Sequence, residues 1–270
     1  MTEPLLFLPT ELAYVLSYTN VKAIIGWGSD PFTPPRGRSD AFYGEGLERL
    51  KKNKRLIRGK QPGRFRFTDE TSRIAATLAD PQIVLLTHRK DGSSVQVLTH
   101  YQKEATVIEM SQDKDSMFRI LFYETLAGPA GAASAFVGAS TRPSTIEPRP
   151  VRLEADQKKF DRIKQLARKG SGKEAIPEIE DLGADDDAAS SLVAALRKPA
   201  ASGVISVMYC AGNMVQDTET YAVVTNGSDE SWVFFPPASA QGPVVCEQTS
   251  VSSLTARILV AISTRLVLPL

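Results

Sequence analysis

Apolar positions follow two spacings in the first half of the chain. Up to Leu78 they recur every three or four residues, as in helices that bury one face, and after Pro81 they alternate with polar residues, as in strands. The predicted helices open at Thr10, run from about 42 to 56, and follow a Thr68 cap, and the predicted strands cover 65–67, 83–87, 94–101, 106–110 and 118–123. Because short polar turns separate the last four strands, we expect them to pair antiparallel.

The second half repeats this succession. Helices are predicted at about 154–169, 188–196 and 254–266, and strands at 204–210, 220–225, 232–235 and 244–248. Between the halves, a stretch rich in Gly, Ala and Ser (127–139) and a proline-rich stretch (142–150) predict a connector. The acidic run Asp185-Asp186-Asp187 directly precedes a helix, which favours N-capping over cation binding.

A short pattern recurs 118 residues along the chain, where each helix passes into strands. It is Ile74-x-x-x-Leu78-x-x-Pro81 in the first copy and Leu192-x-x-x-Leu196-x-x-Pro199 in the second. We therefore expect an α+β fold made of two related halves, residues 1–140 and 141–270, with quasi-twofold symmetry. Each half should be a mainly antiparallel sheet with helices packed on one side.

Composition limits the class of protein to which this chain can belong. The 270 residues are 42% hydrophobic and 23% charged, which is typical of a globular chain that needs no disulfide or metal to fold. Cys210 and Cys246 form no Cys-x-x-Cys pair, and we expect them to be reduced and buried. Neither a signal peptide nor an apolar stretch long enough to span a membrane is recognisable, which predicts a cytoplasmic location.

Motifs for catalysis are incomplete. The run Lys169–Lys173 resembles the end of a phosphate loop, but Ala167 stands in place of its first glycine and Glu174 in place of its magnesium-binding Ser or Thr. His88 and His100 lie on predicted strands without a nucleophile in a recognisable setting. We therefore predict no enzyme, no metal site and no cofactor.

The most distinctive charged feature is the segment from Arg49 to Arg66, which contains nine basic residues and no acidic one. The net charge of the whole chain is +1, so the rest of the chain carries −8. Helix, glycine-proline turn, strand and capped helix follow one another here, as in a winged-helix module that binds DNA. Its phosphate contacts would be Lys51, Lys52, Lys54, Arg55, Arg64 and Arg66.

Two observations weigh against DNA binding. The remainder of the chain is acidic, and a Gly/Pro-rich loop at 26–38 interrupts any compact helix-turn-helix before Phe42. A solvated helix end, with lysines near the negative end of the helix dipole, explains the same charges. A winged-helix transcriptional regulator therefore remains the alternative hypothesis.

Several short motifs lie along most of the chain. They are Leu8-Pro9-Thr10-Glu11-Leu12, Glu45-Gly46-Leu47-x-x-Leu50 ending in Leu56-Ile57, Thr68 followed by Ile74-x-x-x-Leu78-Ala79-x-Pro81, and Trp232-Val233-Phe234-x-Pro236. Together they resemble the EspG proteins, the secretion-associated chaperones of actinobacterial type VII (ESX) secretion. The resemblance implies a quasi-twofold α+β fold without catalysis. It also implies cytosolic binding of a helical PE–PPE-type substrate near its hydrophobic tip.

The chain departs from the family in one connection. The turn near Gln102–Glu104 is short, whereas the family often contacts its client with a longer hairpin there. The resemblance then points to His100, Tyr101 and Gln102 as the nearest partner-binding candidates. Our first hypothesis is a non-enzymatic binding protein that keeps a helical partner soluble.

Overall fold

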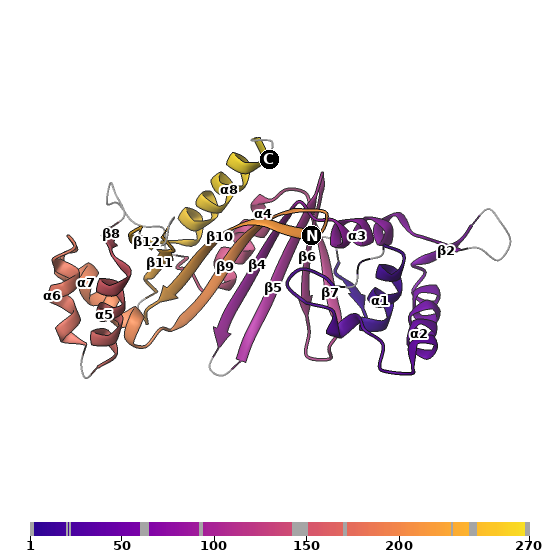
Figure 1. Cartoon of the computed structure of the whole chain (residues 1–270), viewed down its shortest axis with the longest axis horizontal. Coiled ribbons are helices and arrows are strands. Elements are labelled where there is room, and N and C mark those ends of the chain that lie inside the picture. Colours follow the sequence, from indigo (N-terminus) through magenta and orange to yellow (C-terminus); the bar gives the residue numbers. More distant parts are fainter. Residues whose placement is uncertain are drawn as a thin grey trace. The chain divides into compact units, whose positions relative to one another are not determined.

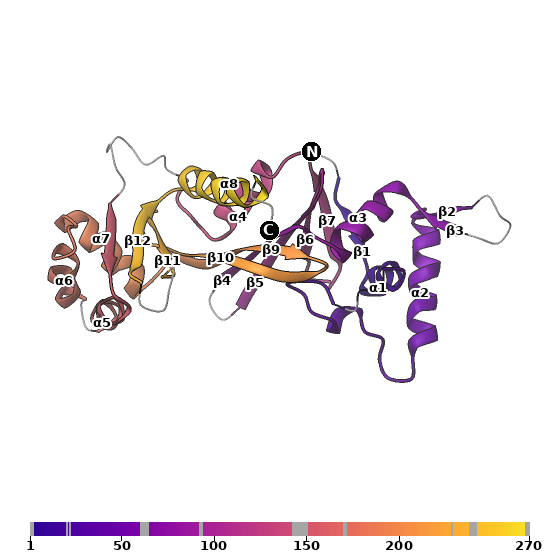
Figure 2. The same cartoon turned by 45° about the horizontal axis from the view of Figure 1, so that its top comes forward.

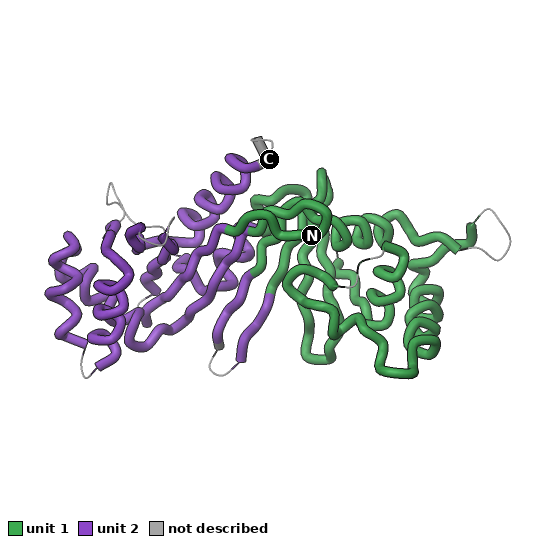
Figure 3. Tube along the Cα trace, viewed as in Figure 1, with its two compact units in different colours: residues 1–86, 98–129, 208–218 green, residues 87–97, 130–207, 219–270 purple. Residues whose placement is uncertain are grey.

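A computed structural model describes residues 3–19, 21, 23–59, 65–91, 94–141, 151–169, 172–227, 229–237 and 242–267. It confirms the α+β class. Contacts divide the chain into two compact units that interleave along the sequence, whereas the sequence predicts a single boundary at residue 140 (Figure 3). Unit 1 comprises residues 1–86, 98–129 and 208–218, and unit 2 comprises residues 87–97, 130–207 and 219–270.

Helices and a small hairpin make up the N-terminal part of unit 1 (Figure 1). They are α1 (Pro9–Ser17), the short 3-10 helix η1 (Asp30–Phe32), α2 (Ser39–Lys52), the hairpin β2 (Leu56–Arg58) and β3 (Phe65–Phe67), and α3 (Asp69–Ala79). The predicted second helix ends early, because the backbone at Lys54 turns left-handed (φ 56°) and the chain continues as β2. The hairpin pairs Ile57 with Arg66.

The main sheet has ten strands in the order β1-β7-β6-β5-β4-β9-β10-β11-β12-β8. Strands β5, β6 and β7 pair antiparallel, with His100 opposite Glu109 between β5 and β6. The strands are β1 (Leu5–Phe7), β4 (Ile83–Asp91), β5 (Ser94–Lys103), β6 (Thr106–Gln112), β7 (Phe118–Tyr123), β8 (Arg152–Ala155), β9 (Ala201–Ala211), β10 (Met214–Thr225), β11 (Ser231–Phe235) and β12 (Val244–Thr249).

The predicted repeat is confirmed in the order of elements. Helix α3 ends four residues before β4 begins, and α7 (Asp186–Arg197) ends four residues before β9 begins, at an offset of 118 in both cases. Asp80 and Lys198 close these helices with nearly the same dihedrals, φ −149°, ψ 64° and φ −144°, ψ 79°. The strand order reads alike from both edges, with β1 matched by β8 and β4 by β9.

Unit 2 holds the remaining helices, and one of them corrects the sequence prediction. They are α4 (Ala127–Phe136), α5 (Gln157–Arg168), α6 (Ile176–Glu180), α7 and α8 (Val251–Val267). The predicted connector at 127–139 is wrong, because α4 occupies it and lies beside α8 (Figures 1 and 2). Ala130 and Ala133 are fully buried, and Thr255 of α8 donates to Ser134 at 3.2 Å. The proline-rich stretch 142–150 lies outside the described residues.

Each unit has its own apolar core. The core of unit 1 gathers Leu12, Ile74 and Tyr101, and that of unit 2 gathers Phe160, Leu192 and Trp232. Both cysteines are free and buried, as predicted, and burial raises the pKa of Cys210 to about 11. Within the described ranges, no helix combines the length and apolarity that crossing a membrane requires.

Candidate partner-binding surface

Helix α1 is the element around which the best candidate site is built. Its buried side chains include Leu12, Val15 and Leu16, which pack into the core of unit 1. Glu11 is 1% exposed, and its carboxylate accepts hydrogen bonds from the Leu8 backbone at 2.8 Å, Asn53 at 2.8 Å and Arg55 at 3.1 Å. This network fixes the helix against the end of α2 and leaves both of its flanks available to line cavities.

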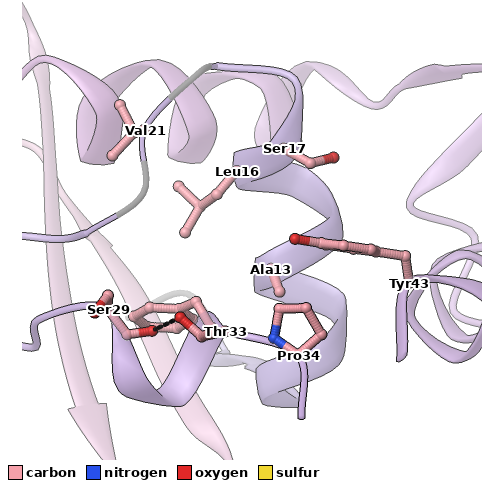
Figure 4. A pocket seen from close by; sticks show the side chains of 9 residues that line it. Ala13, Leu16, Ser17, Val21, Ser29, Thr33, Pro34 and Tyr43 are labelled. Carbon is pink, nitrogen blue, oxygen red and sulfur yellow. Dashed lines mark hydrogen bonds between the residues drawn. The ribbon is translucent and has the colours of Figure 1, made fainter. Parts of the chain in front are cut away.

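One flank borders a cavity of about 630 Å³ between α1, η1 and the side chain of Tyr43, which we name the η1 groove. Its lining is largely apolar, including Ala13, Leu16, Phe32 and Pro34. Tyr43 reaches across from α2 and points its hydroxyl toward α1 (Figure 4). The η1 turn is held by a hydrogen bond from the Thr33 hydroxyl to the Ser29 carbonyl at 2.9 Å.

The other flank borders a cavity of about 720 Å³ between α1, α2 and the β2–β3 hairpin, which we name the hairpin groove. Tyr14, Tyr18 and Phe67 form a cluster there, with Tyr18 and Phe67 centroids 5.3 Å apart in an edge-to-face arrangement. Burial, followed by the neighbouring Tyr18 hydroxyl, raises the pKa of Tyr14 to about 12. Tyr18 is 66% exposed and Phe65 is 45% exposed, so the groove presents aromatic surface to solvent.

Exposed aromatic side chains gathered in a concave site are typical of protein-binding surfaces. Isolated exposed apolar residues are ordinary, but here Tyr18 and Phe65 share one groove. Arg66 lines the hairpin groove, and the Lys51 ammonium lies 5.1 Å from the Phe65 ring centroid. Beside its apolar contact area, the groove lining carries one positive and one negative side chain, Arg66 and Asp69.

The structure separates the residues predicted to contact phosphates into different environments. Lys52, Lys54 and Arg66 are exposed. Lys51 pairs with Glu48 at 2.6 Å on the surface of α2. Arg64 lies outside the described residues.

Arg55 corrects that prediction. Its side chain is 13% exposed, pairs with Glu11, and lies with its guanidinium carbon 3.7 Å from the Phe7 ring centroid. A guanidinium held between a buried carboxylate and a ring is not available to a phosphate. The sequence could not reveal this, because Glu11 and Phe7 are distant from Arg55 along the chain.

The arrangement also differs from the winged-helix alternative. Helices α1 and α2 are separated by residues 18–38, which contain η1, so no short turn joins them as in a helix-turn-helix. The hairpin lies between α2 and α3 instead of following the last helix. The arrangement of elements in unit 1 therefore differs from that of a winged-helix module.

The predicted partner-binding residues His100, Tyr101 and Gln102 are brought together on β5, but they are buried. Their exposed fractions are 1%, 0% and 8%. The Tyr101 hydroxyl donates to the Ile25 carbonyl at 2.7 Å, and Gln102 donates to the Glu104 carbonyl at 2.7 Å. Gln102 thus supports the β5–β6 turn, whereas Tyr101 ties β5 to the loop at Ile25. The turn is short, as predicted, since only Glu104 and Ala105 separate the strands.

His100 belongs to a small polar cluster inside unit 1. Its Nε2 lies 3.2 Å from a Glu109 carboxylate oxygen, to which the Tyr123 hydroxyl donates at 2.7 Å. Burial raises the pKa of Glu109, but hydrogen bonds from His100 and Tyr123 and the charge of Arg119 outweigh burial and hold it below its ordinary value. Within this cluster the His100 ring is 1% exposed, whereas Tyr123 is partly exposed.

We expect Glu109 to make stability depend on pH under acidic conditions. Its folded pKa lies below its unfolded value of about 4.3, so its contribution is present above that pH and is lost as pH falls through the folded pKa. Urea unfolding from about pH 7 to about pH 3 should show a smaller acid-induced loss in Glu109→Gln than in the unmodified protein. Identical pH profiles for the two proteins would contradict this role.

The remaining polar features resolve into structural roles. The Asp185 carboxylate accepts from the Ala188 backbone at 2.8 Å and caps α7, as predicted. Among the described residues, no group of three His, Cys, Asp or Glu side chains is arranged to hold a metal ion. Gly170 and Ser171 of the loop that resembles a phosphate loop lie outside the described residues, and Gly172 adopts φ 77°.

Sequence reasoning missed the two grooves. Phe67 is distant from Tyr14 and Tyr18 along the chain, and only the packing of α1 beside the hairpin brings the three rings together. One signal was present, since Tyr14 and Tyr18 stand four residues apart on a helix whose Leu12, Val15 and Leu16 already supply a buried face.

Comparisons with known proteins find a solved structure with a similar fold. No protein-family model matches the chain, and no curated protein gives a significant match. Among solved structures, the chain is similar to the Mycobacterium tuberculosis type VII secretion system chaperone EspG5 in complex with the PE25–PPE41 dimer. The likeness covers 95% of this chain and 94% of that chain, with a TM-score of 0.62 at 9% identity. The expected EspG-like architecture is confirmed at the level of the fold.

Proposed function

We propose that this chain, which has the fold of EspG5, is a non-enzymatic chaperone that binds a helical protein and keeps it soluble. The observation that supports this most is the extent of the likeness, which covers 95% of the chain and therefore both units. EspG5 is a type VII secretion chaperone whose structure contains a PE25–PPE41 dimer. By analogy, a PE–PPE-type secretion substrate is the proposed client, and the cytoplasm is the proposed location.

The grooves beside α1 supply a physical means of binding a helix. An amphipathic helix binds a groove by burying a row of apolar side chains against an apolar or aromatic wall. The hairpin groove offers Tyr18 and Phe65 as exposed aromatic anchors, and such residues often dominate binding energy. We therefore assign the hairpin groove as the main contact for the client's apolar tip.

Co-expression tests this function directly. PE–PPE-type pairs from the organism that encodes this chain should be largely insoluble alone and soluble in its presence. They should co-purify with it as a stoichiometric complex in size-exclusion chromatography. Pairs that remain insoluble, or that elute apart from this chain, would contradict the chaperone role.

The assigned groove is tested by substitution. Tyr18→Ala and Phe65→Ala each remove an exposed aromatic anchor, and we expect each to weaken client binding at least about tenfold. Met214→Ala is the matched control, because Met214 is 64% exposed in unit 1 and does not line the hairpin groove. Titration calorimetry with a purified client pair measures the effect. Equal affinities for the Tyr18 variant and the control would exclude the groove while leaving the chaperone function open.

A further inference from the structure

The exposed aromatic ring of Phe65 in the hairpin groove has a cation beside it from each of two elements. From α2, the Lys51 ammonium lies 5.1 Å from the ring centroid. From β2, Arg58 is the residue directly opposite Phe65 in the β2–β3 hairpin. The hairpin extends away from α2 and α3 (Figure 1), and both Phe65 and Arg58 are exposed, so a bound protein can reach them together.

The pairing of the hairpin places Arg58 on the face that borders the groove. Residues directly opposite on paired strands share a face, as do residues two apart on one strand. Arg58 therefore shares its face with Phe65. Leu56 and Phe67 belong to the same face, and together with Phe65 they line the hairpin groove. Because Arg58 does not line the cavity itself, its charge lies at the rim.

No carboxylate in the described part of the chain pairs with Arg58. Its exposed side chain makes no ion pair and no hydrogen bond among the described residues, whereas Lys51 pairs with Glu48 at 2.6 Å. The helix dipole accounts for the basic residues in the last turn of α2, but Arg58 lies on a strand, which has no comparable dipole. The acidic lining residue of the groove, Asp69, lies in the first turn of α3, where the dipole of that helix favours a negative charge. The cation at Arg58 is therefore available to a partner.

We infer that the client helix carries an acidic side chain one turn away from the apolar residue that contacts Phe65, and that Arg58 recognises this acidic side chain. The inference rests on the proposed function and names the chemistry of its client. Opposite residues of a hairpin have Cβ atoms about 4.5–5.5 Å apart, which is close to the spacing of about 5–6 Å between residues three or four apart on a helix.

A helix that lies across the two strands and buries an apolar side chain against Phe65 therefore brings a residue of its next turn to Arg58. A carboxylate at that position gains a charge-assisted hydrogen bond, because the planar donors of a guanidinium match its two oxygens. The hairpin would thus select clients by an apolar residue and an acidic residue on the same face of one helix.

The kinetics of association with a purified PE–PPE-type pair from the organism that encodes this chain test the contact. A charge at the rim of an interface acts mainly on the association rate and is screened by salt. We expect Arg58→Glu to slow association at least about fivefold at about 50 mM salt, and the difference should nearly vanish at about 500 mM. Arg36→Glu is the matched control, because it makes the same change of charge at an exposed position before the N-terminus of α2, with about 20 Å of helix between it and the hairpin. We expect the control to slow association less than about twofold.

The outcomes separate this contact from the function on which it rests. If the unmodified chain does not bind the pair, the chaperone function fails and the acidic contact fails with it. If the pair binds and Arg58→Glu associates as fast as Arg36→Glu, the function stands and the acidic contact is overturned. Where Arg58→Glu alone is slow, acidic residues of the client are replaced by amides one at a time. One of them, three or four residues from an apolar residue, should be coupled to Arg58, and the absence of any coupled residue would also overturn the contact.

A second arm tests nucleic acid as the source of the negative charge. The anisotropy of a fluorescent single-stranded thymidine oligonucleotide is measured at about 50 mM salt with the unmodified chain and both variants. Oligonucleotide binding that Arg58→Glu abolishes and Arg36→Glu does not, together with a client whose association is insensitive to Arg58, would assign this cation to nucleic acid and overturn the inference.

Discussion

Replacing Arg55 with methionine should destabilise the protein by about 3–5 kcal/mol, because it leaves a buried carboxylate without its positive partner. Glu11 is 1% exposed, and its remaining partners are Asn53 and the Leu8 backbone. The substitution also removes the guanidinium that lies 3.7 Å from the Phe7 ring centroid. Urea unfolding followed by circular dichroism measures the loss in free energy of unfolding.

Two further variants show whether the ion pair itself is responsible. The double variant Glu11→Gln/Arg55→Met should be less destabilised than the sum of the single variants, with coupling of at least about 1 kcal/mol. Lys51→Met is the control, because the Lys51–Glu48 pair is exposed and such pairs contribute less than about 1 kcal/mol. Additive single effects would show that Arg55 acts through packing alone.

Replacing Gly46 with alanine should destabilise unit 1 by about 2–3 kcal/mol, because α1 and α2 cross at this glycine. A Cβ atom at Gly46 would lie 2.2 Å from the Thr10 carbonyl oxygen, a backbone atom that can move away only if the helices separate. These helices also carry Leu47 and Tyr43 toward the two grooves, so client binding should weaken as well.

Gly44 provides a control within the same helix. A Cβ atom there meets nothing within 4 Å, so Gly44→Ala should raise the free energy of unfolding by about 0.5–1 kcal/mol through helix propensity. Thermal unfolding should therefore move in opposite directions for the two variants. Shifts of the same sign would mean that contact with α1 does not decide the effect at Gly46.

The parts of the fold that could be predicted from the sequence are those fixed by residues close to one another along the chain. Thr68 and Asp185 each accept a hydrogen bond from the first turn of their own helix, so the helix starts could be read from residues a few positions apart. The change of spacing after Pro81 and Pro199 marked where helices pass into strands. By contrast, α4 was missed because alanine and glycine give no apolar periodicity, although small side chains suit its close packing beside α8.

The sequence by itself therefore determined most of the longer helices and strands, the repeat at an offset of 118, and the α+β class, but not α4 or the short strands β1, β2 and β8. Only the tertiary structure decided what the side chains do. It placed Arg55 beside Glu11, 44 residues away, and gathered Tyr18 and Phe67 into one groove. It also placed Arg58 opposite Phe65 in the hairpin. The physical reason is that periodicity and capping depend on neighbours along the chain, whereas burial, ion pairing and cavity lining depend on residues that only folding brings together.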